Sequence, residues 1–305
     1  MSRRILSLMV FFTMVSTAAF AQSNILNAKT PAEIGKKTAA QDSLDNDNPL
    51  PYGYVGDRDV LLARKVWERI DLDQRVNFPM YFPVEGNLGP DRKPLYDVLI
   101  EAIRDGKITE VYDDSYFTTK KTFKDIEASL SSIDTTDAGK EEMSTDMAAY
   151  RSGKKTISEQ YITRTDLKAY HVAGYEVVGL WYFDKRQGEL KYRMLGISPM
   201  LPDVFTVGKP DVEPEYFANT WVYFPAARDV LHKAKAFNER NSAMPITFDH
   251  LLNSRRFSGV IYKEENVYGD RLVEDYQKDN SQMQLLEAER IKDKIRNFEQ
   301  DMWNY

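Results

Sequence analysis

The sequence predicts an α+β fold in which antiparallel β-hairpins pack with several helices, between a flexible N-terminal arm and a long C-terminal amphipathic helix. Residues 175–183 are β-branched and aromatic, residues 184–188 have the composition of a turn, and residues 189–197 resume with partial alternation. This order is typical of an antiparallel hairpin. Apolar side chains recur every three or four positions in residues 95–103 and again in residues 271–305, which is typical of amphipathic helices.

The first 21 residues predict export from the cytoplasm. Arg3 and Arg4 form a short positive segment, residues 5–15 are apolar, and the segment ends on a small-x-small pattern that signal peptidase accepts. We therefore expect cleavage between Ala21 and Gln22. The alternative, an uncleaved membrane anchor, is weaker because the apolar run is well short of the roughly 20 residues that span a bilayer.

Composition narrows the possible partners. The net charge is −6, and removal of the two signal-peptide arginines leaves −8 on the mature chain. A negative chain without a dense Lys/Arg cluster argues against nucleic acid and weakens the case for direct adhesion to anionic lipid. The chain has no cysteine, and Gln22 stands where a bacterial lipoprotein would need one. We expect membrane contact to occur only through protein partners.

The N-terminal arm is expected over residues 22–48, which are rich in Lys, Asp, Asn, Ala and Thr and poor in large apolar side chains. Short apolar points such as Ile25-Leu26 and Ile34 leave open a second interpretation, in which the arm orders on a neighbour. Order is expected to begin at residues 49–54, where prolines and a glycine form a turn and tyrosines supply area to bury.

The first element of the core is expected to be a helix that ends before Asn77. Asp57 or Asp59 can cap it, and four apolar residues follow at near-helical spacing. They are Leu61, Leu62, Val66 and Ile70.

A second helix is expected after Pro94, with Gly106 as its stop. Residues 108–117 then predict a strand and turn, and residues 122–130 a short helix. Residues 131–156 are mostly Ser, Thr, Asp, Gly, Lys and Glu, and are the best candidate for a long internal loop.

Prolines after the hairpin are expected to interrupt regular structure until a strand at residues 220–224. These prolines are Pro199, Pro202, Pro210 and Pro214. The core domain is expected over residues 49–269, followed by a helical extension over residues 270–305. Similar short motifs follow one another in the same order in residues 78–112 and 220–262, which predicts a weak internal duplication.

The C-terminal helix carries one apolar stripe, and two surfaces could cover it. The stripe consists of Leu285, Ala288, Ile291, Ile295, Phe298 and Met302. Docking on the protein's own core is the usual outcome for an amphipathic terminal helix. In the alternative, a partner subunit covers part of the stripe. The candidate partner-contact residues are then Ile291, Ile295, Phe298 and Met302.

Recognisable catalytic, cofactor and metal motifs are absent from the sequence. There is no Cys, the three histidines are far apart, and no Gly-x-Ser-x-Gly elbow occurs. The acidic pairs Asp71 with Asp73 and Asp113 with Asp114 are more typical of exposed charges or caps than of acid/base catalysis. We expect no cofactor, no metal and no catalytic residue.

Clusters of aromatic residues are the most unusual feature of this sequence. They lie at residues 81–82, 181–183 and 221–224. The simplest interpretation is a core without cysteines; an interface with another protein comes second, and a platform for sugars third.

Several motifs together resemble the GldN/PorN family of gliding-motility and type IX secretion subunits, over nearly the whole mature chain. These motifs are Ile25-Leu26-Asn27-Ala28-Lys29, Pro51-Tyr52-Gly53-Tyr54 with Asp57-Arg58-Asp59-Val60, Trp67-Glu68-Arg69-Ile70-Asp71, and Trp181-Tyr182-Phe183-Asp184-Lys185-Arg186 with Gly196-Ile197-Ser198-Pro199.

The resemblance implies a non-enzymatic, periplasmic subunit held at the inner face of the outer membrane. Its implied partners are a GldK/PorK-type outer-membrane lipoprotein, the periplasmic domain of a GldM/PorM-type motor protein, and other copies of itself in a ring. The family supplies no catalytic residues. The competing class is a periplasmic module that binds peptidoglycan or another glycan, or an uncharacterised periplasmic enzyme.

Overall fold

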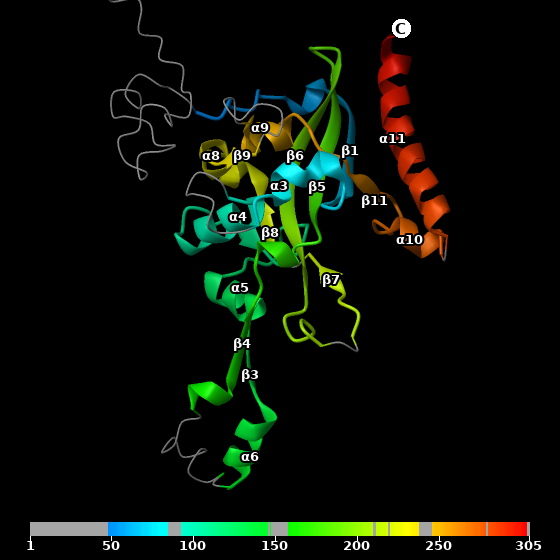
Figure 1. Cartoon of the computed structure of the whole chain (residues 1–305). Helices are drawn as coiled ribbons and strands as arrows, with labels where there is room; N and C mark the ends of the chain where they lie inside the picture. Colours follow the sequence, from blue (N-terminus) through cyan, green and yellow to red (C-terminus); the bar gives the residue numbers. More distant parts are fainter. Residues whose placement is uncertain are drawn as a thin grey trace, which may run out of the picture.

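The computed structural model describes residues 48–84, 93–145, 147, 158–209, 212–218, 220–237, 246–278 and 280–303 of the chain. The predicted signal peptide, its cleavage site at Ala21 and Gln22, and all but the last residue of the predicted arm lie outside these ranges. The fold is α+β, as the sequence predicts, with helices packed against an antiparallel sheet (Figure 1).

The main sheet has seven strands, in the order β11-β1-β5-β6-β8-β2, with β7 paired to β6 outside this path. These strands are β1 (Val60–Asp71), β2 (Val111–Tyr112), β5 (Gly174–Asp184), β6 (Glu189–Pro202), β7 (Tyr216–Phe217), β8 (Trp221–Tyr223) and β11 (Val260–Glu264). The predicted hairpin is confirmed as β5 and β6, which pair from Gly174 opposite Met200 to Asp184 opposite Glu189. Gly188 closes its turn at a φ of +66°, a conformation that suits glycine.

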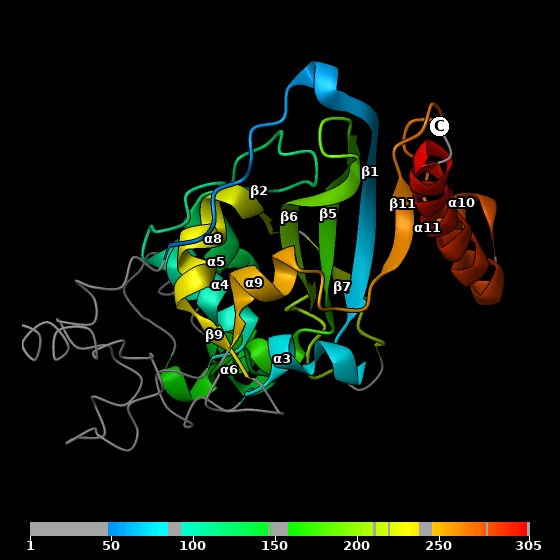
Figure 2. The ribbon, with the colours of Figure 1, turned by 90° about the horizontal axis from the view of Figure 1, so that it is seen from above.

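Helices lie on one side of this sheet and beyond its β11 edge (Figure 2). These helices include α4 (Leu95–Arg104), α5 (Phe123–Leu130), α8 (Phe224–Lys233), α9 (Phe248–Asn253) and α11 (Ser281–Trp303). The helices predicted after Pro94 and over residues 122–130 are confirmed as α4 and α5. Thr122 and Asp125 form a capping box at the start of α5. Gly106 follows α4 at a φ of +70°, as expected of a helix stop.

Short elements complete the fold. They are η3 (Asp57–Asp59), η4 (Arg75–Asn77), α3 (Phe78–Tyr81), β3 (Ser131–Thr135), α6 (Asp137–Thr145), η5 (Glu159–Tyr161), β4 (Ile162–Asp166), η6 (Ala169–His171), β9 (Lys235–Ala236), β10 (Ile246–Thr247) and α10 (Val273–Tyr276). The predicted domain division at residue 269 and the internal duplication stay predictions.

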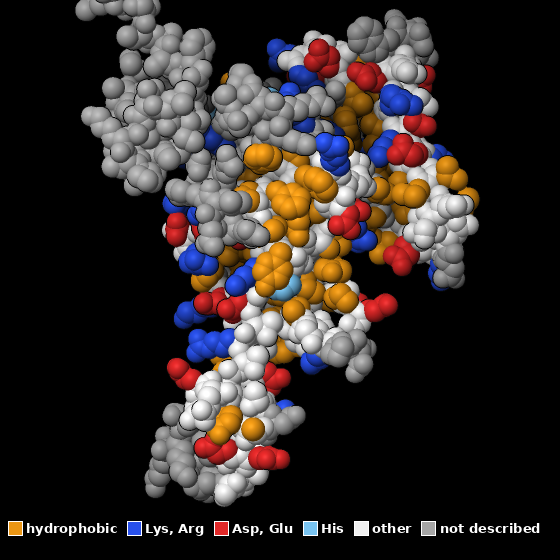
Figure 3. Space-filling view, viewed as in Figure 1, with side chains coloured by type: hydrophobic (Ala, Val, Ile, Leu, Met, Phe, Trp, Pro, Cys, Tyr) orange, Lys and Arg blue, Asp and Glu red, His pale blue; other side chains and the backbone are white. Residues whose placement is uncertain are grey.

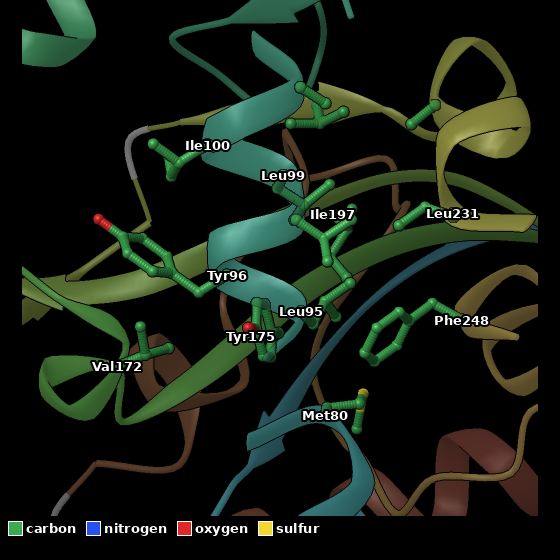
Figure 4. Packing of buried hydrophobic residues seen from close by; sticks show 14 of the residues in the cluster. Met80, Leu95, Tyr96, Leu99, Ile100, Val172, Tyr175, Ile197, Leu231 and Phe248 are labelled. Carbon is green, nitrogen blue, oxygen red and sulfur yellow. The ribbon is translucent and has the colours of Figure 1, made fainter. Parts of the chain in front are cut away.

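The main core lies between the sheet and α4, α8 and α9 (Figure 4). Leu95 and Leu99 of α4, Ile197 of β6, Leu231 of α8 and Phe248 of α9 are all buried there. Each fully buried side chain of this size contributes about 1.5–3 kcal/mol of transfer free energy. These segments are far apart in the sequence, so the core is built almost entirely from long-range contacts.

The helix predicted to carry Leu61, Leu62, Val66 and Ile70 is wrong, because these residues lie in strand β1. β1 pairs with β5 on one side and with β11 on the other. Val66, Trp67 and Glu68 are consecutive and all buried, so the strand lacks the alternation by which strands are recognised. Pairing with two neighbouring strands outweighs the local spacing.

The long loop predicted over residues 131–156 is wrong in its first half. Strand β3 and helix α6 lie there, and β3 pairs with β4 in a two-stranded ladder below the main sheet (Figure 1). Ile133 of β3 is exposed, and most of the other side chains on this ladder are polar. A ladder with little apolar surface to bury leaves only a weak hydrophobic signal in the sequence.

The predicted break at Pro199 and Pro202 is also wrong, because β6 continues through both prolines. Pro199 lies opposite Tyr175 of β5, and Pro202 opposite Tyr216 of β7. The long strand accommodates them where its other neighbour, β8, no longer pairs with it. A proline needs no hydrogen-bond partner for its nitrogen, so it fits a position without a second neighbouring strand.

An ion pair joins Arg255, in the segment after α9, to Glu68 of β1. Arg255 donates a hydrogen bond of 2.8 Å from Nη2 to Oε2 of Glu68, whose side chain is almost fully buried. The guanidinium also lies 4.1 Å from the ring centroid of Tyr192 and 5.0 Å from that of Trp181. Within the described residues, Glu68 Oε1 and Arg255 Nη1 have no hydrogen-bond partner. Glu68 is therefore buried and Arg255 partly exposed, and each has one buried polar atom without a hydrogen-bond partner.

Candidate interaction site

Asn77 joins the start of α3 to the end of β1 and to the distant segment before β11. Its buried side-chain amide donates hydrogen bonds to the backbone oxygens of Asp71 and Ser258, and its Oδ1 accepts one from the Ser258 N–H. Pro79 stands in the first turn of α3, where its missing N–H costs nothing. These constraints hold α3 in one position on the protein surface.

Aromatic side chains on α3 point outward from this fixed support. Phe78 and Phe82 are exposed, and their ring centroids lie 5.3 Å apart in an edge-to-face arrangement. Tyr81 is 4.8 Å from Phe82 and reaches into a neighbouring pocket. In the space-filling view, hydrophobic side chains gather over α3 at the centre of this face (Figure 3).

Helix η6 adds the next aromatic residue. Leu167, Ala169 and Val172 are buried, so Tyr170 between them is turned outward. Its ring centroid is 4.1 Å from that of His171, whose Nδ1 accepts a hydrogen bond of 3.0 Å from the N–H of the preceding Lys168.

A pocket of about 440 Å³ joins these elements. Tyr81, Tyr170 and Tyr216 line it together with Lys209 and His171. We call Phe78, Tyr81, Phe82, Tyr170 and Tyr216, with the pocket between them, the aromatic face. Exposed aromatic side chains on rigid supports are typical of residues that carry binding energy at protein interfaces.

His171 lies in the same pocket, and its lowered pKa makes the stability of the protein depend on pH. Burial, and to a lesser extent the charge of Lys168, lowers the pKa of His171 below its usual 6.5. The unfolded chain therefore binds the proton more readily, so the contribution of His171 to stability is present above pH 6.5 and is lost as pH falls below it. We expect His171→Gln to flatten the dependence of the unfolding free energy on pH between about 5.5 and 7.5. Urea denaturation across that range measures this, and an imidazole that titrates at or above pH 6.5 in NMR contradicts it.

The middle of the predicted C-terminal stripe packs on the chain's own sheet, whereas Leu285 at its start is 52% exposed. Ile291 and Ile295 are 2% and 5% exposed and form a second core with Val66 and Ile261. Phe298 contacts the ring of Phe183 at 5.9 Å between centroids. Met302 is partly exposed. Contact of the stripe with a partner stays a prediction.

The predicted aromatic clusters separate into two kinds. Tyr182, Phe183, Trp221 and Phe224 are buried, whereas Phe82 is exposed. Sequence reasoning singled out Phe82 but missed Tyr170 and Tyr216 of the aromatic face. The signal at Tyr170 was a tyrosine beside a histidine among mostly apolar residues, which is too common a pattern to identify a surface.

Both acidic pairs take part in local turns. Asp114 accepts hydrogen bonds from the backbone N–H groups of Tyr116 and Thr118 and so closes a turn. Asp71 accepts one from the backbone N–H of Asp73. Across the described ranges, no group of three or more His, Asp or Glu side chains is placed to hold a metal ion. In the same ranges, no helix has both the length and the apolar character to cross a membrane.

The structure is therefore that of an α+β protein that exposes several aromatic side chains around one pocket. The family model described as "Gliding motility associated protein GldN" matches residues 55–304. This is most of the chain, which therefore belongs to the GldN family, a component of the gliding-motility and type IX secretion machinery. No curated protein sequence matches the chain.

Proposed function

We propose that this chain is a non-enzymatic structural subunit of the type IX secretion and gliding-motility machinery. In this proposal it forms a periplasmic ring with an outer-membrane lipoprotein of the GldK/PorK type and contacts the periplasmic region of a GldM/PorM-type motor protein. The observation that carries the proposal is the family match over residues 55–304.

Features of the sequence support the periplasmic location in this proposal. A signal peptide ending at Ala21 would deliver the chain through the inner membrane. Gln22 at the cleavage point and the lack of cysteine leave no site for lipidation there. A lipidated partner would then hold the subunit at the inner face of the outer membrane.

The aromatic face supports binding to a protein partner. Its rings project from α3, η6 and β7 and from the residue after α3, so backbone elements of the fold set their positions. In the proposal, this face is where the lipoprotein or the motor region binds. Tyr170 and Tyr216, which are 52% and 42% exposed, are its accessible members on the pocket rim.

A capture experiment tests the proposal. Tagged mature chain is expected to retain the lipoprotein and the motor fragment from solubilised envelopes, and Tyr170→Ala with Tyr216→Ala to weaken binding of one of them at least tenfold. Tyr54→Ala is the matched control, because Tyr54 is an exposed tyrosine away from this pocket. Capture of neither partner contradicts the proposal. A lone monomer that retains muropeptides instead favours the glycan-binding class.

A further inference from the structure

The described chain begins at a firmly held position. The Tyr52 hydroxyl donates a hydrogen bond of 2.9 Å to Oδ1 of Asn253. Its ring lies between the guanidinium groups of Arg193 and Arg228, 4.7 and 4.3 Å from its centroid. Arg193 also donates a hydrogen bond to the backbone oxygen of Gly53. Residues before Tyr52 therefore leave the molecule from a defined place beside α8 and α9.

A second pocket lies at the β11 edge of the sheet, between β11 and helices α10 and α11. Its volume is about 460 Å³, and Val260, Tyr262, Leu272, Gln284 and Leu285 are among the residues that line it. In the described part of the chain, β1 is the only strand that pairs with β11. We call this pocket and the exposed side chains beside it the C-terminal groove; those side chains are Met283, Leu285 and Leu286.

The two features lie at opposite ends of the molecule. Figures 1 and 2 are related by a turn about the horizontal axis, and in both the chain enters at the α8–α9 end while α11 stands at the far end. A contact between unlike surfaces on opposite ends joins copies head to tail, which yields a ring when the rotation closes.

The length of the N-terminal segment favours binding to the groove of a neighbouring copy over binding to the groove of the same chain. Residues 22–47 number 26, and a random coil of that many residues has an end-to-end distance of about 28 Å. A compact body of roughly 250 residues is about 45 Å across. The segment would have to stretch around its own body to reach its own C-terminal groove, whereas a neighbour can present the groove close to its origin.

The charge and the apolar side chains of the N-terminal segment complement those of the C-terminal groove. Residues 22–37 contain three lysines and one glutamate, whereas residues 38–47 contain three aspartates and no basic residue. Residues 264–289 around the C-terminal groove contain eight acidic and two basic residues, so only residues 22–37 complement its charge. Ile25 and Leu26 supply apolar side chains that the groove can bury. Opposite charges steer the encounter, and apolar burial stabilises the complex.

From these observations we infer that residues 22–37 of one copy bind in the C-terminal groove of the next copy, with residues 38–47 as the connection, and link the subunits head to tail. The inference rests on the proposed function, since it names the contact between copies of the ring.

Disulfide trapping tests this inference, because the chain has no cysteine to interfere. A tagged mature chain with Leu26→Cys is mixed with an untagged chain carrying Leu285→Cys, and oxidised mildly. We expect a tagged–untagged dimer at least tenfold more abundant than with an Ile133→Cys partner. Ile133 is the matched control, because it is an exposed apolar residue on the β3–β4 ladder.

The chain carrying both Leu26→Cys and Leu285→Cys separates the remaining outcomes. A ladder of linked copies supports the inference, whereas an internal disulfide in a monomer overturns it, since the segment then binds its own groove. Equal trapping with Ile133→Cys also overturns it. If these results appear while the lipoprotein and motor fragment are still captured, only this inference fails and the proposed function stands.

Discussion

Replacing Arg255 by methionine is expected to lower the free energy of unfolding by about 3–5 kcal/mol, the cost of leaving a buried charge without its partner. Glu68 is 0% exposed, and Arg255 donates a hydrogen bond to its carboxylate. The arginine also packs over Tyr192 and Trp181, so the variant loses cation–π contacts as well. Urea denaturation measures the change.

The matched control removes both charges. Glu68→Leu combined with Arg255→Met is expected to recover most of the loss, because no uncompensated charge remains and two unpaired polar atoms are eliminated. A double variant as unstable as the single Arg255→Met would contradict this account. In that case the packing of the arginine over the aromatic rings, and not its charge, would hold β1 to the segment after α9.

Ile291→Ala and Ile295→Ala are each expected to destabilise the isolated protein by about 2–5 kcal/mol, as is usual for truncated core side chains. Both residues join α11 to the second core with Val66 and Ile261. For a chain of this size, the melting temperature should fall by several degrees for each variant. Calorimetry of the mature protein measures it.

Leu286→Ala is the matched control for these two variants. Leu286 stands on the same helix but is 63% exposed, so its loss should change stability by less than about 0.5 kcal/mol. If the isoleucine variants melt normally while assembly fails, the stripe is an interface with a partner, and its packing on the sheet is not what holds α11.

The aromatic face and the C-terminal groove have separate locations and different chemistry. The aromatic face is built from rings on and around α3, η6 and β7. The C-terminal groove is built from β11, α10 and α11, in an acidic part of the sequence. In the proposals made here, a subunit can therefore hold a partner and the next copy at once. Tyr170→Ala and Leu285→Cys address the two surfaces independently.

Elements whose signal is local could be predicted from the sequence. The β5–β6 hairpin combines β-branched runs with a turn ending at Gly188, and α4 combines a sustained apolar period with a glycine stop. The C-terminal helix α11 was predicted for the same reason, since its stripe recurs over several turns. In each case neighbouring residues alone determine the preferred backbone conformation.

The strand β1 could not be predicted in this way. Its residues Val66, Trp67 and Glu68 face two different cores or an ion pair, and their environments come from β5, β11 and Arg255. Pairing with distant strands decides the backbone there. Likewise, a proline such as Pro199 interrupts a strand only where a neighbour needs its N–H, and the sequence does not say where neighbours lie.

The sequence alone determined the α+β class, the main hairpin, helices α4 and α11, and the motifs that resemble the family. Only the tertiary structure decided that β1 is a strand, that Trp221 is buried while Phe82 is exposed, and that Tyr170 and Tyr216 meet around one pocket. The physical reason is that burial depends on which distant segments cover a side chain. Local patterns record the preferences of a segment, whereas a surface exists only after the whole chain has packed.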